Sequence, residues 1–187
     1  MPEFLKRLID AICYPARWIS WLTLPLIAMI LVTVVMAQFG SSTLLDWEGQ
    51  IPILGRALTV NSLVDLQWYI FALLVLFGGI WALRDDRHVS VDFLSLQMSR
   101  RQQLWFRMLG DLVFLLPFCL IMAWYGWSFA EVAWRTAEAS TQGGLNNRWL
   151  IKSVLPISFG MMGLLGLARA IGTAIQLYRG NLSEDIR

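Results

Sequence analysis

Residues 18–45, WISWLTLPLIAMILVTVVMAQFGSSTLL, decide the fold because no charged residue interrupts them. Three later stretches, residues 66–83, 112–130 and 153–168, are also free of charge. A helix needs about 20 apolar residues to cross roughly 30 Å of hydrocarbon. Because lipid offers backbone groups no hydrogen bonds, such stretches must be helices. The sequence therefore predicts an all-α integral membrane protein, a four-helix unit that forms a single membrane domain over residues 1–187.

The composition supports this fold class. The chain is 57% hydrophobic and only 15% charged, whereas soluble domains carry about 25% charged residues. The fourth span reaches full length if the Arg169 side chain extends toward the headgroups. Pro25 and Pro117 predict local kinks, because proline cannot donate a backbone hydrogen bond. We place the four spans at about 18–40, 65–84, 108–131 and 151–175, with a tail at 180–187.

The first residues, 1–17, are predicted to form a short amphipathic helix on the membrane surface. Lys6, Arg7 and Asp10 would stay in water on one side of it. The side chains expected to face lipid are Phe4, Leu5, Leu8 and Ile12. We therefore expect a surface-lying helix before the first span.

The distribution of Lys and Arg predicts the orientation, since these residues favour the cytoplasmic side. Four of them, Arg56, Arg135, Arg148 and Lys152, fall in or beside the first and third connections. Both termini are therefore expected in the cytoplasm. The other eleven fall on the opposite side: Lys6, Arg7, Arg17, Arg84, Arg87, Arg100, Arg101, Arg107, Arg169, Arg179 and Arg187.

The connections between the spans contain capping and turn residues. Residues 41–64 are expected to lie against the membrane surface or a partner, and Ser62 with Asp65 has the spacing of a capping box. Asp92 is predicted to cap a short surface helix over residues 93–97. Ser99 is predicted to cap the third membrane helix. The connection at about 136–147 holds Gly143-Gly144 and Asn146-Asn147, which are turn residues.

The ionisable residues near the membrane lie close to span ends, where structural pairing is expected. Asp65 is predicted to pair with Lys152, with Arg148 one turn earlier in the sequence. Asp111 is predicted to pair with Arg107 or Arg84. Small residues at helical spacing let helices approach closely. We expect such packing inside this unit at Gly78 with Ala82, and at Gly166 with Ala170 and Ala174. The alternative is that these residues pack against a partner's helix.

Catalytic chemistry is not predicted. His88 is the single histidine, and a membrane b-type haem needs two axial ligands that one histidine cannot supply. No glycine-rich phosphate loop followed by Lys is present. We therefore expect no enzyme activity, no metal and no cofactor in this chain, and no nucleic acid as a partner.

Three stretches together resemble one family. They are Leu66-Gln67-Trp68-Tyr69, the string ALRDDRHVSVD over residues 82–92, and Gly143-Gly144-Leu145 followed by RWLIK over residues 148–152. In this order, and with four spans, they resemble the small, DctQ-like membrane subunit of TRAP (tripartite ATP-independent periplasmic) transporters. The likeness covers roughly residues 15–178.

This resemblance implies a bacterial inner-membrane subunit paired with a large, DctM-like membrane subunit. The large subunit would carry substrate and sodium by an elevator motion, and a periplasmic binding protein would deliver an organic acid. This chain would be the static scaffold. Arg148 and Lys152 would brace its outer side or bind phospholipid phosphates. Other structural or partner contacts are expected at Arg84, Asp86, His88, Asp92, Trp68, Asp65 and Trp149, and binding-protein docking at Asp46, Glu48, Arg56, Arg135 and Glu138.

Two alternatives come from other classes. A self-sufficient small exporter, working as a dimer, would need a membrane-embedded acid to couple protons, and the nearest acids, Asp65 and Asp111, lie at opposite span edges. A membrane anchor of a redox complex would suit the aromatic content. The lone His88 disfavours haem binding by that anchor.

Overall fold

The computed structural model describes residues 3–40, 42–51, 55–85, 98–140 and 144–184. Four helical segments in this part of the chain, residues 3–38, 60–84, 100–135 and 149–178, are long and apolar enough to cross a membrane. The fold is thus the predicted all-α four-helix unit. Its helices are α1 Glu3–Ile19, α2 Thr23–Gln38, α3 Val60–Arg84, α5 Arg100–Leu109, α6 Leu116–Arg135 and α7 Trp149–Glu184.

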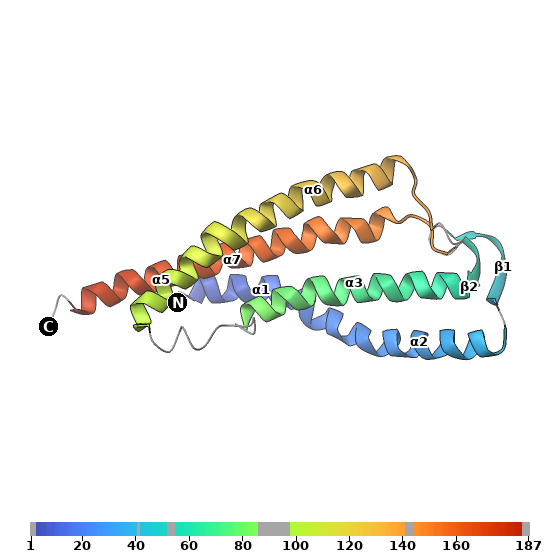
Figure 1. Ribbon diagram of the computed structural model, residues 1–187, viewed down its shortest axis with the longest axis horizontal. Coiled ribbons are helices and arrows are strands. Elements are labelled where there is room, and N and C mark those ends of the chain that lie inside the picture. The colour runs from blue at the N-terminus through green and yellow to red at the C-terminus, as the bar shows by residue number, and fades with distance from the viewer. Residues whose placement is uncertain (1–2, 41, 52–54, 86–97, 141–143, 185–187) are drawn as a thin grey trace.

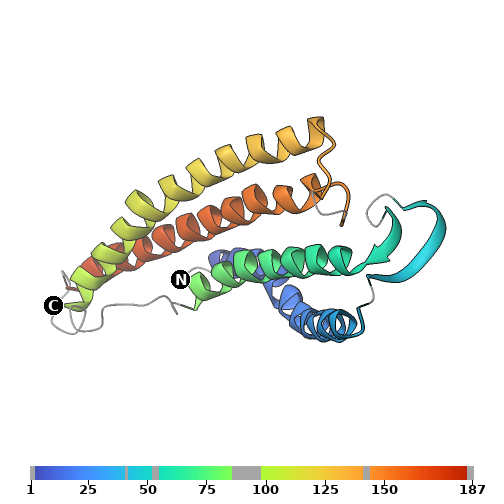
Figure 2. The same ribbon diagram turned by 45° about the vertical axis from the view of Figure 1, so that its right-hand side comes forward.

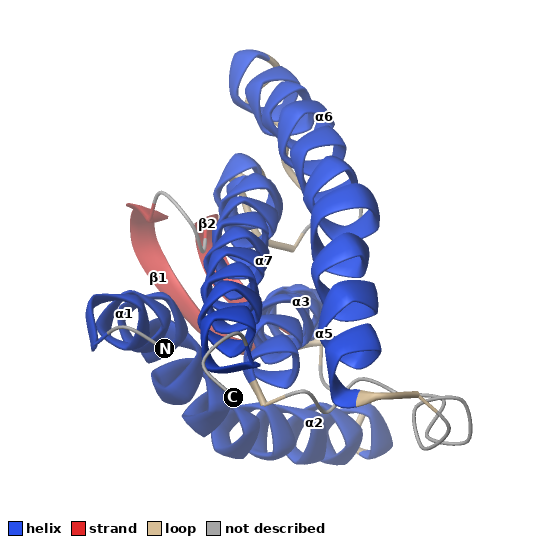
Figure 3. Cartoon of the chain, turned by 90° about the vertical axis from the view of Figure 1, so that its left-hand side faces the viewer, coloured by secondary structure: helices blue, strands red, loops and turns tan. Residues whose placement is uncertain are grey.

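The helices form an elongated bundle (Figure 1). Seen from its end, α7 lies at the centre, and it contacts both α6 and α3 (Figure 3). The start of α1 and the end of α7 lie at the same end of the bundle, which we call the terminal end (Figure 1). We call the other end, where α2, α6 and the strands lie outermost, the hairpin end. Placing both termini in the cytoplasm stays a prediction.

The core of the bundle lies where α1, α3 and α7 meet. Ile80 and Leu165 are fully buried there, beside Phe77 of α3. From α1, Leu5 and Ile12 are also buried, so the prediction that they face lipid is wrong. The helix is amphipathic as expected, but its apolar side packs mainly on α3 and α7. Phe4 and Leu8 remain exposed.

Two helix irregularities accompany the prolines predicted to kink the chain. A 3-10 turn, η1 (Ser20–Leu22), precedes Pro25, and a π-helix, η2 (Gly110–Leu115), precedes Pro117. Proline deprives the carbonyl four residues earlier of its helical donor, and those carbonyls fall inside η1 and η2. At η1 the backbone compensates, because the Thr23 N–H donates to the carbonyls of Ser20 and Trp21. Figures 1 and 2 show α2 leaving α1 at an angle.

The connection before α3 contains a β-hairpin that the sequence analysis did not predict. Strand β1 (Thr43–Ile51) pairs antiparallel with β2 (Gly55–Thr59), with Thr43 opposite Thr59 and Ile51 opposite Gly55. The register shifts between Asp46 and Ile51. Gly49 lies in that interval with φ of 125°, a conformation that glycine adopts readily.

The hairpin runs directly into α3, and this changes the predicted cap. Thr59 is the N-cap residue, and its side-chain oxygen accepts a hydrogen bond from the Ser62 N–H at 3.2 Å. The proposed capping box of Ser62 with Asp65 is therefore wrong by three residues. The predicted cap at Ser99 is confirmed: its side chain and that of Gln102 form a reciprocal capping box at the start of α5. The cap predicted at Asp92 lies outside the described residues.

Close helix contacts are made by small residues, though not by all those predicted. A Cβ added to Gly166 would lie 2.7 Å from Leu115 Cδ2, so this part of the predicted stripe packs inside the unit. The prediction fails for Gly78, since no described atom lies within 4 Å of an added Cβ there. The crossing of α6 and α7 depends instead on Gly126, where an added Cβ would lie 2.7 Å from Leu155 Cδ2 and 3.3 Å from the Pro156 nitrogen.

We expect Gly126→Leu to destabilise the bundle by about 1–3 kcal/mol, because the larger side chain overfills the contact between α6 and α7. Thermal unfolding in mild detergent measures the effect. Gly160→Leu is the matched control, since no described atom lies within 4 Å of an added Cβ at that position of α7. Equal unfolding temperatures for the two variants would contradict the packing described for Gly126.

Candidate functional site

The polar residues of the chain gather at the two ends of the bundle. At the hairpin end, Asp65 of α3 meets Gly144 and Leu145 of the connection between α6 and α7. In the same connection, Glu138 forms ion pairs with Arg148 and Lys152 at the start of α7. We refer to Asp65, Glu138, Arg148 and Lys152 as the hairpin-end cluster.

Asp65 anchors the connection between α6 and α7. Its Oδ2 atom accepts a hydrogen bond from the Leu145 N–H at 3.0 Å, and Leu145 is fully buried. A Cβ added to Gly144 would clash with the same carboxylate and lie 3.1 Å from the Asn61 carbonyl oxygen, so a larger residue here would displace the Asp65 side chain. The contact was predicted as an ion pair with Lys152, which is wrong: the carboxylate binds a backbone donor instead.

Lys152 pairs with Glu138. Its Nζ atom donates to Glu138 Oε2 at 2.5 Å and also lies 4.0 Å from the centre of the Phe129 ring. The second carboxylate oxygen of Glu138 lies 3.9 Å from Arg148 Nη1, and the Arg148 N–H donates to the Glu138 carbonyl at 3.0 Å. These contacts hold Glu138 against the start of α7. Glu138 is thus held within the chain, and its role in docking a binding protein stays a prediction.

At the terminal end, Arg169 and Asp111 form a buried ion pair. Arg169 Nε lies 3.4 Å from Asp111 Oδ2, and both side chains are about 90% buried. Arg169 also donates through Nη1 to the Leu83 carbonyl at the end of α3, where helical carbonyls lack a partner within the helix. One side chain of α7 therefore joins η2 and α3. Pairing of Asp111 with Arg107 or Arg84 stays a prediction. The predicted extension of the Arg169 side chain toward the headgroups is wrong, because that side chain is buried.

Arg84 joins α3 to the N-terminal helix. It forms an ion pair with Asp10 of α1, and its guanidinium carbon lies 5.3 Å from the centre of the Trp81 ring. This is a structural contact within the chain, and contact of Arg84 with a partner stays a prediction. Three further residues at which structural or partner contacts were predicted lie outside the described residues: Asp86, His88 and Asp92.

The remaining predicted contact residues lie mostly on the surface of the hairpin end. Trp68 is exposed beside Phe71, and Trp149 packs edge-to-face on Trp134 with ring centres 4.5 Å apart. Among the residues proposed to dock a binding protein, Asp46 is exposed on β1. Arg135 is exposed and pairs with Glu131. Glu48 and Arg56 lie in β1 and β2, and their side chains are outside the described part.

These contacts suit a structural unit. Except for Arg135–Glu131 within α6 and Arg148–Glu138 within one connection, the ion pairs described above join different elements of this chain. Within residues 3–40, 42–51, 55–85, 98–140 and 144–184 no three His, Cys, Asp or Glu side chains are grouped as metal ligands would be. The Arg169–Asp111 and Lys152–Glu138 pairs were not predicted. Their partners are 58 and 14 residues apart in the sequence, too far for helical spacing to indicate a pair.

We expect Arg169→Met to destabilise the bundle by about 3–5 kcal/mol, because it leaves the Asp111 carboxylate buried without its partner. The double variant Arg169→Met/Asp111→Leu should recover most of this loss, since it leaves no buried charge at the pair. Thermal unfolding of wild type, both single variants and the double variant measures the coupling. Additive losses in the double variant would contradict the pairing.

Comparison with known proteins agrees with the resemblance seen in the sequence. Residues 51–176 match the family model described as "Tripartite ATP-independent periplasmic transporters, DctQ component". The matched region includes α3, α5, α6 and most of α7, and therefore the hairpin-end cluster and the Arg169–Asp111 pair. No curated protein matches the chain. Because the family model covers well over half of its length, the chain belongs to the DctQ family, the small membrane component of TRAP transporters.

Proposed function

We propose that this chain is the static scaffold subunit of a sodium-coupled TRAP transporter in the bacterial inner membrane. In this role it anchors a large, DctM-like membrane subunit that binds sodium and substrate. A periplasmic binding protein delivers an organic acid to the pair. The family supplies the three-part organisation; sodium coupling, the acid substrate and anchoring are the parts we propose.

The observation that supports a scaffold most strongly is that charged side chains pair with one another between different elements of the bundle. Arg169 with Asp111, and Lys152 with Glu138, connect different elements at the two ends of the bundle. The uncharged middle of each span contains no acid or base that could couple an ion gradient to movement. A scaffold needs such fixed contacts and no ion site of its own.

The surface of the bundle suits a subunit that packs against a larger one. Helix α2, all of whose residues the structure describes, has none buried, and a hydrogen bond from Gln67 Nε2 to Thr33 Oγ1 at 2.7 Å helps to hold it on α3. Its apolar side chains therefore face lipid or a partner's helices. The exporter alternative is less well supported, because Asp111 is paired with Arg169 and Asp65 is bonded to Leu145.

We expect sodium-driven uptake in proteoliposomes to require this chain, the large membrane subunit and the binding protein together. Omitting this chain should reduce uptake to the background level, because the mobile part would lack its anchor. Radiolabelled acid uptake under an imposed sodium gradient provides the measurement, with a potassium gradient as control. Full uptake without this chain would contradict the scaffold role, and proton-driven solute transport by this chain alone would establish the exporter alternative.

The exposed hairpin is proposed to contribute to docking of the binding protein. We expect Asp46→Lys to raise the binding-protein concentration that gives half-maximal uptake by roughly threefold to tenfold, because exposed interfacial charges mainly set the rate of association. The large subunit should still co-purify. Arg101→Glu, an exposed charge reversal at the terminal end, is the control. An unchanged concentration dependence with Asp46→Lys would exclude this residue from docking.

A further inference from the structure

A pocket of about 230 Å³ lies between α5 and α7 near the terminal end of the bundle. Helix α5 begins at this end and runs inward beside the C-terminal part of α7 (Figures 1 and 2). The pocket lining combines one arginine with aromatic and aliphatic side chains. The described residues that line it are Arg101, Trp105, Met108, Ala174, Leu177 and Tyr178.

Helix α5 brings positive charge to this pocket and no negative charge. Its sequence over residues 100–109, RRQQLWFRML, contains three arginines and no acid. Arg101 is exposed, and in the part of the chain that the structure describes it has no acidic partner. None of the described residues that line the pocket is an acid either. The pocket therefore suits a ligand with a negative charge.

The pocket is charged at its outer end and apolar further in. Trp105 and Met108 follow Arg101 by one and two turns of α5, about 6 and 10 Å along the axis. On α7, which runs the other way, Tyr178 lies further out than Ala174. Tryptophan and tyrosine prefer the depth at which headgroups meet acyl chains. A phospholipid has the same order, because its phosphate lies outside its acyl chains.

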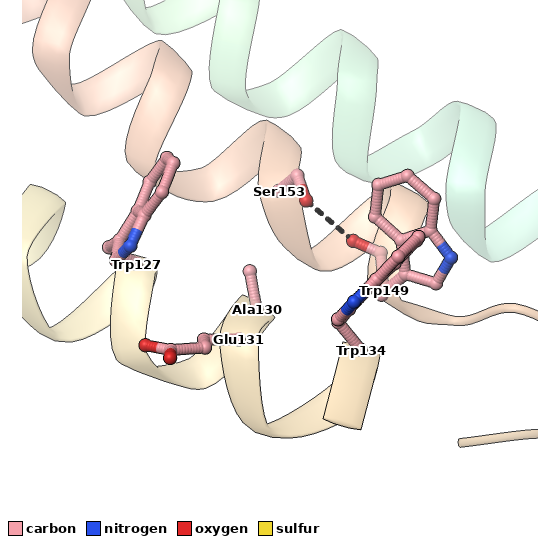
Figure 4. A pocket seen from close by; sticks show the side chains of 6 residues that line it. All are labelled: Trp127, Ala130, Glu131, Trp134, Trp149 and Ser153. Atoms are coloured by element: carbon pink, nitrogen blue, oxygen red, sulfur yellow. Dashed lines mark hydrogen bonds between the residues drawn. The ribbon is translucent and has the colours of Figure 1, made fainter. Parts of the chain in front are cut away.

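The pocket between α6 and α7 at the hairpin end differs in its charged groups (Figure 4). It is also lined by tryptophan rings, but its carboxylate, Glu131, already pairs with Arg135. The Ser153 hydroxyl there donates to the Trp149 carbonyl at 2.7 Å (Figure 4). Both polar groups are thus bonded within the chain, whereas Arg101 has no such bond to the described residues.

We propose that the pocket between α5 and α7 binds an anionic phospholipid. Its phosphate accepts hydrogen bonds from the Arg101 guanidinium, a group whose planar geometry suits phosphate oxygens. One acyl chain follows Trp105 and Met108 toward the middle of the membrane. An anionic headgroup is favoured over an aminophospholipid, because an ammonium group would meet the arginines of α5 and no acid among the described residues that line the pocket.

This site differs from the one predicted for lipid phosphates at Arg148 and Lys152. In the structure both of those side chains interact with Glu138, and they lie at the other end of the bundle. The inference needs only that α5 begins at a membrane surface. It therefore stands or falls separately from the scaffold role.

The test uses the full chain, with any membrane subunit that co-purifies, in nanodiscs of equal phosphatidylglycerol and phosphatidylethanolamine. After transfer to mild detergent, native mass spectrometry counts the lipids that remain bound. We expect the wild type to retain phosphatidylglycerol over phosphatidylethanolamine. Arg101→Gln should lower phosphatidylglycerol retention roughly threefold to tenfold, the range expected when one arginine near an anionic headgroup is lost.

Arg7→Gln is the matched control, because it removes an exposed arginine of α1 that does not line the pocket. Its phosphatidylglycerol retention should equal that of the wild type, and both variants should keep the wild-type unfolding temperature. Equal retention of the two lipids by the wild type, or equal losses in the two variants, would overturn the proposal.

A photoreactive residue in place of Leu177, which lines the pocket, distinguishes a lipid from a protein neighbour. We expect it to capture phosphatidylglycerol when the purified protein is irradiated in the same nanodiscs. Capture of a partner's helix in place of the lipid would overturn the proposal as well.

Discussion

The structure depends on the high cost of leaving a charge or a backbone polar group unpaired in lipid. The chain meets this constraint by keeping the middle of every span uncharged and by pairing charges at the ends. The Arg169–Asp111 pair is the clearest case. It is about 90% buried, and the same arginine also satisfies the Leu83 carbonyl at the end of α3. A single long side chain therefore resolves two polar groups and joins three elements.

The same constraint explains the contacts at the hairpin end. Asp65 lies in the first turns of α3, and its carboxylate accepts a backbone N–H from the neighbouring connection. Lys152 lies in the first turn of α7 and pairs with Glu138. Between these ends, close packing of glycine at the α6–α7 crossing replaces polar contacts. The bundle is thus fixed at both ends and tightly packed between them, which fits the scaffold role proposed above.

Much of this fold could be predicted from the sequence, because long uncharged stretches have one stable structure in lipid. The four helices, the Ser99 cap and the irregularities near Pro25 and Pro117 follow from local rules. The hairpin before α3 did not follow, since short strands carry a weak local signal. The partner of Asp65 was mispredicted, and the Arg169–Asp111 pair was not predicted. These residues meet their partners only through tertiary packing, which helical spacing does not reveal.

The central claim is that lipid surrounds the middle of each of the four helices. The accessibility of these positions to lipid-soluble and water-soluble relaxing agents tests this claim most directly. Single nitroxide labels at Leu31, Val75, Leu120 and Leu164, all exposed residues of the isolated chain, would be measured by electron paramagnetic resonance in lipid nanodiscs. If lipid surrounds the four spans, molecular oxygen should relax every label more than a water-soluble nickel complex does. A label relaxed more strongly by the nickel complex would place water at that helix and contradict the account.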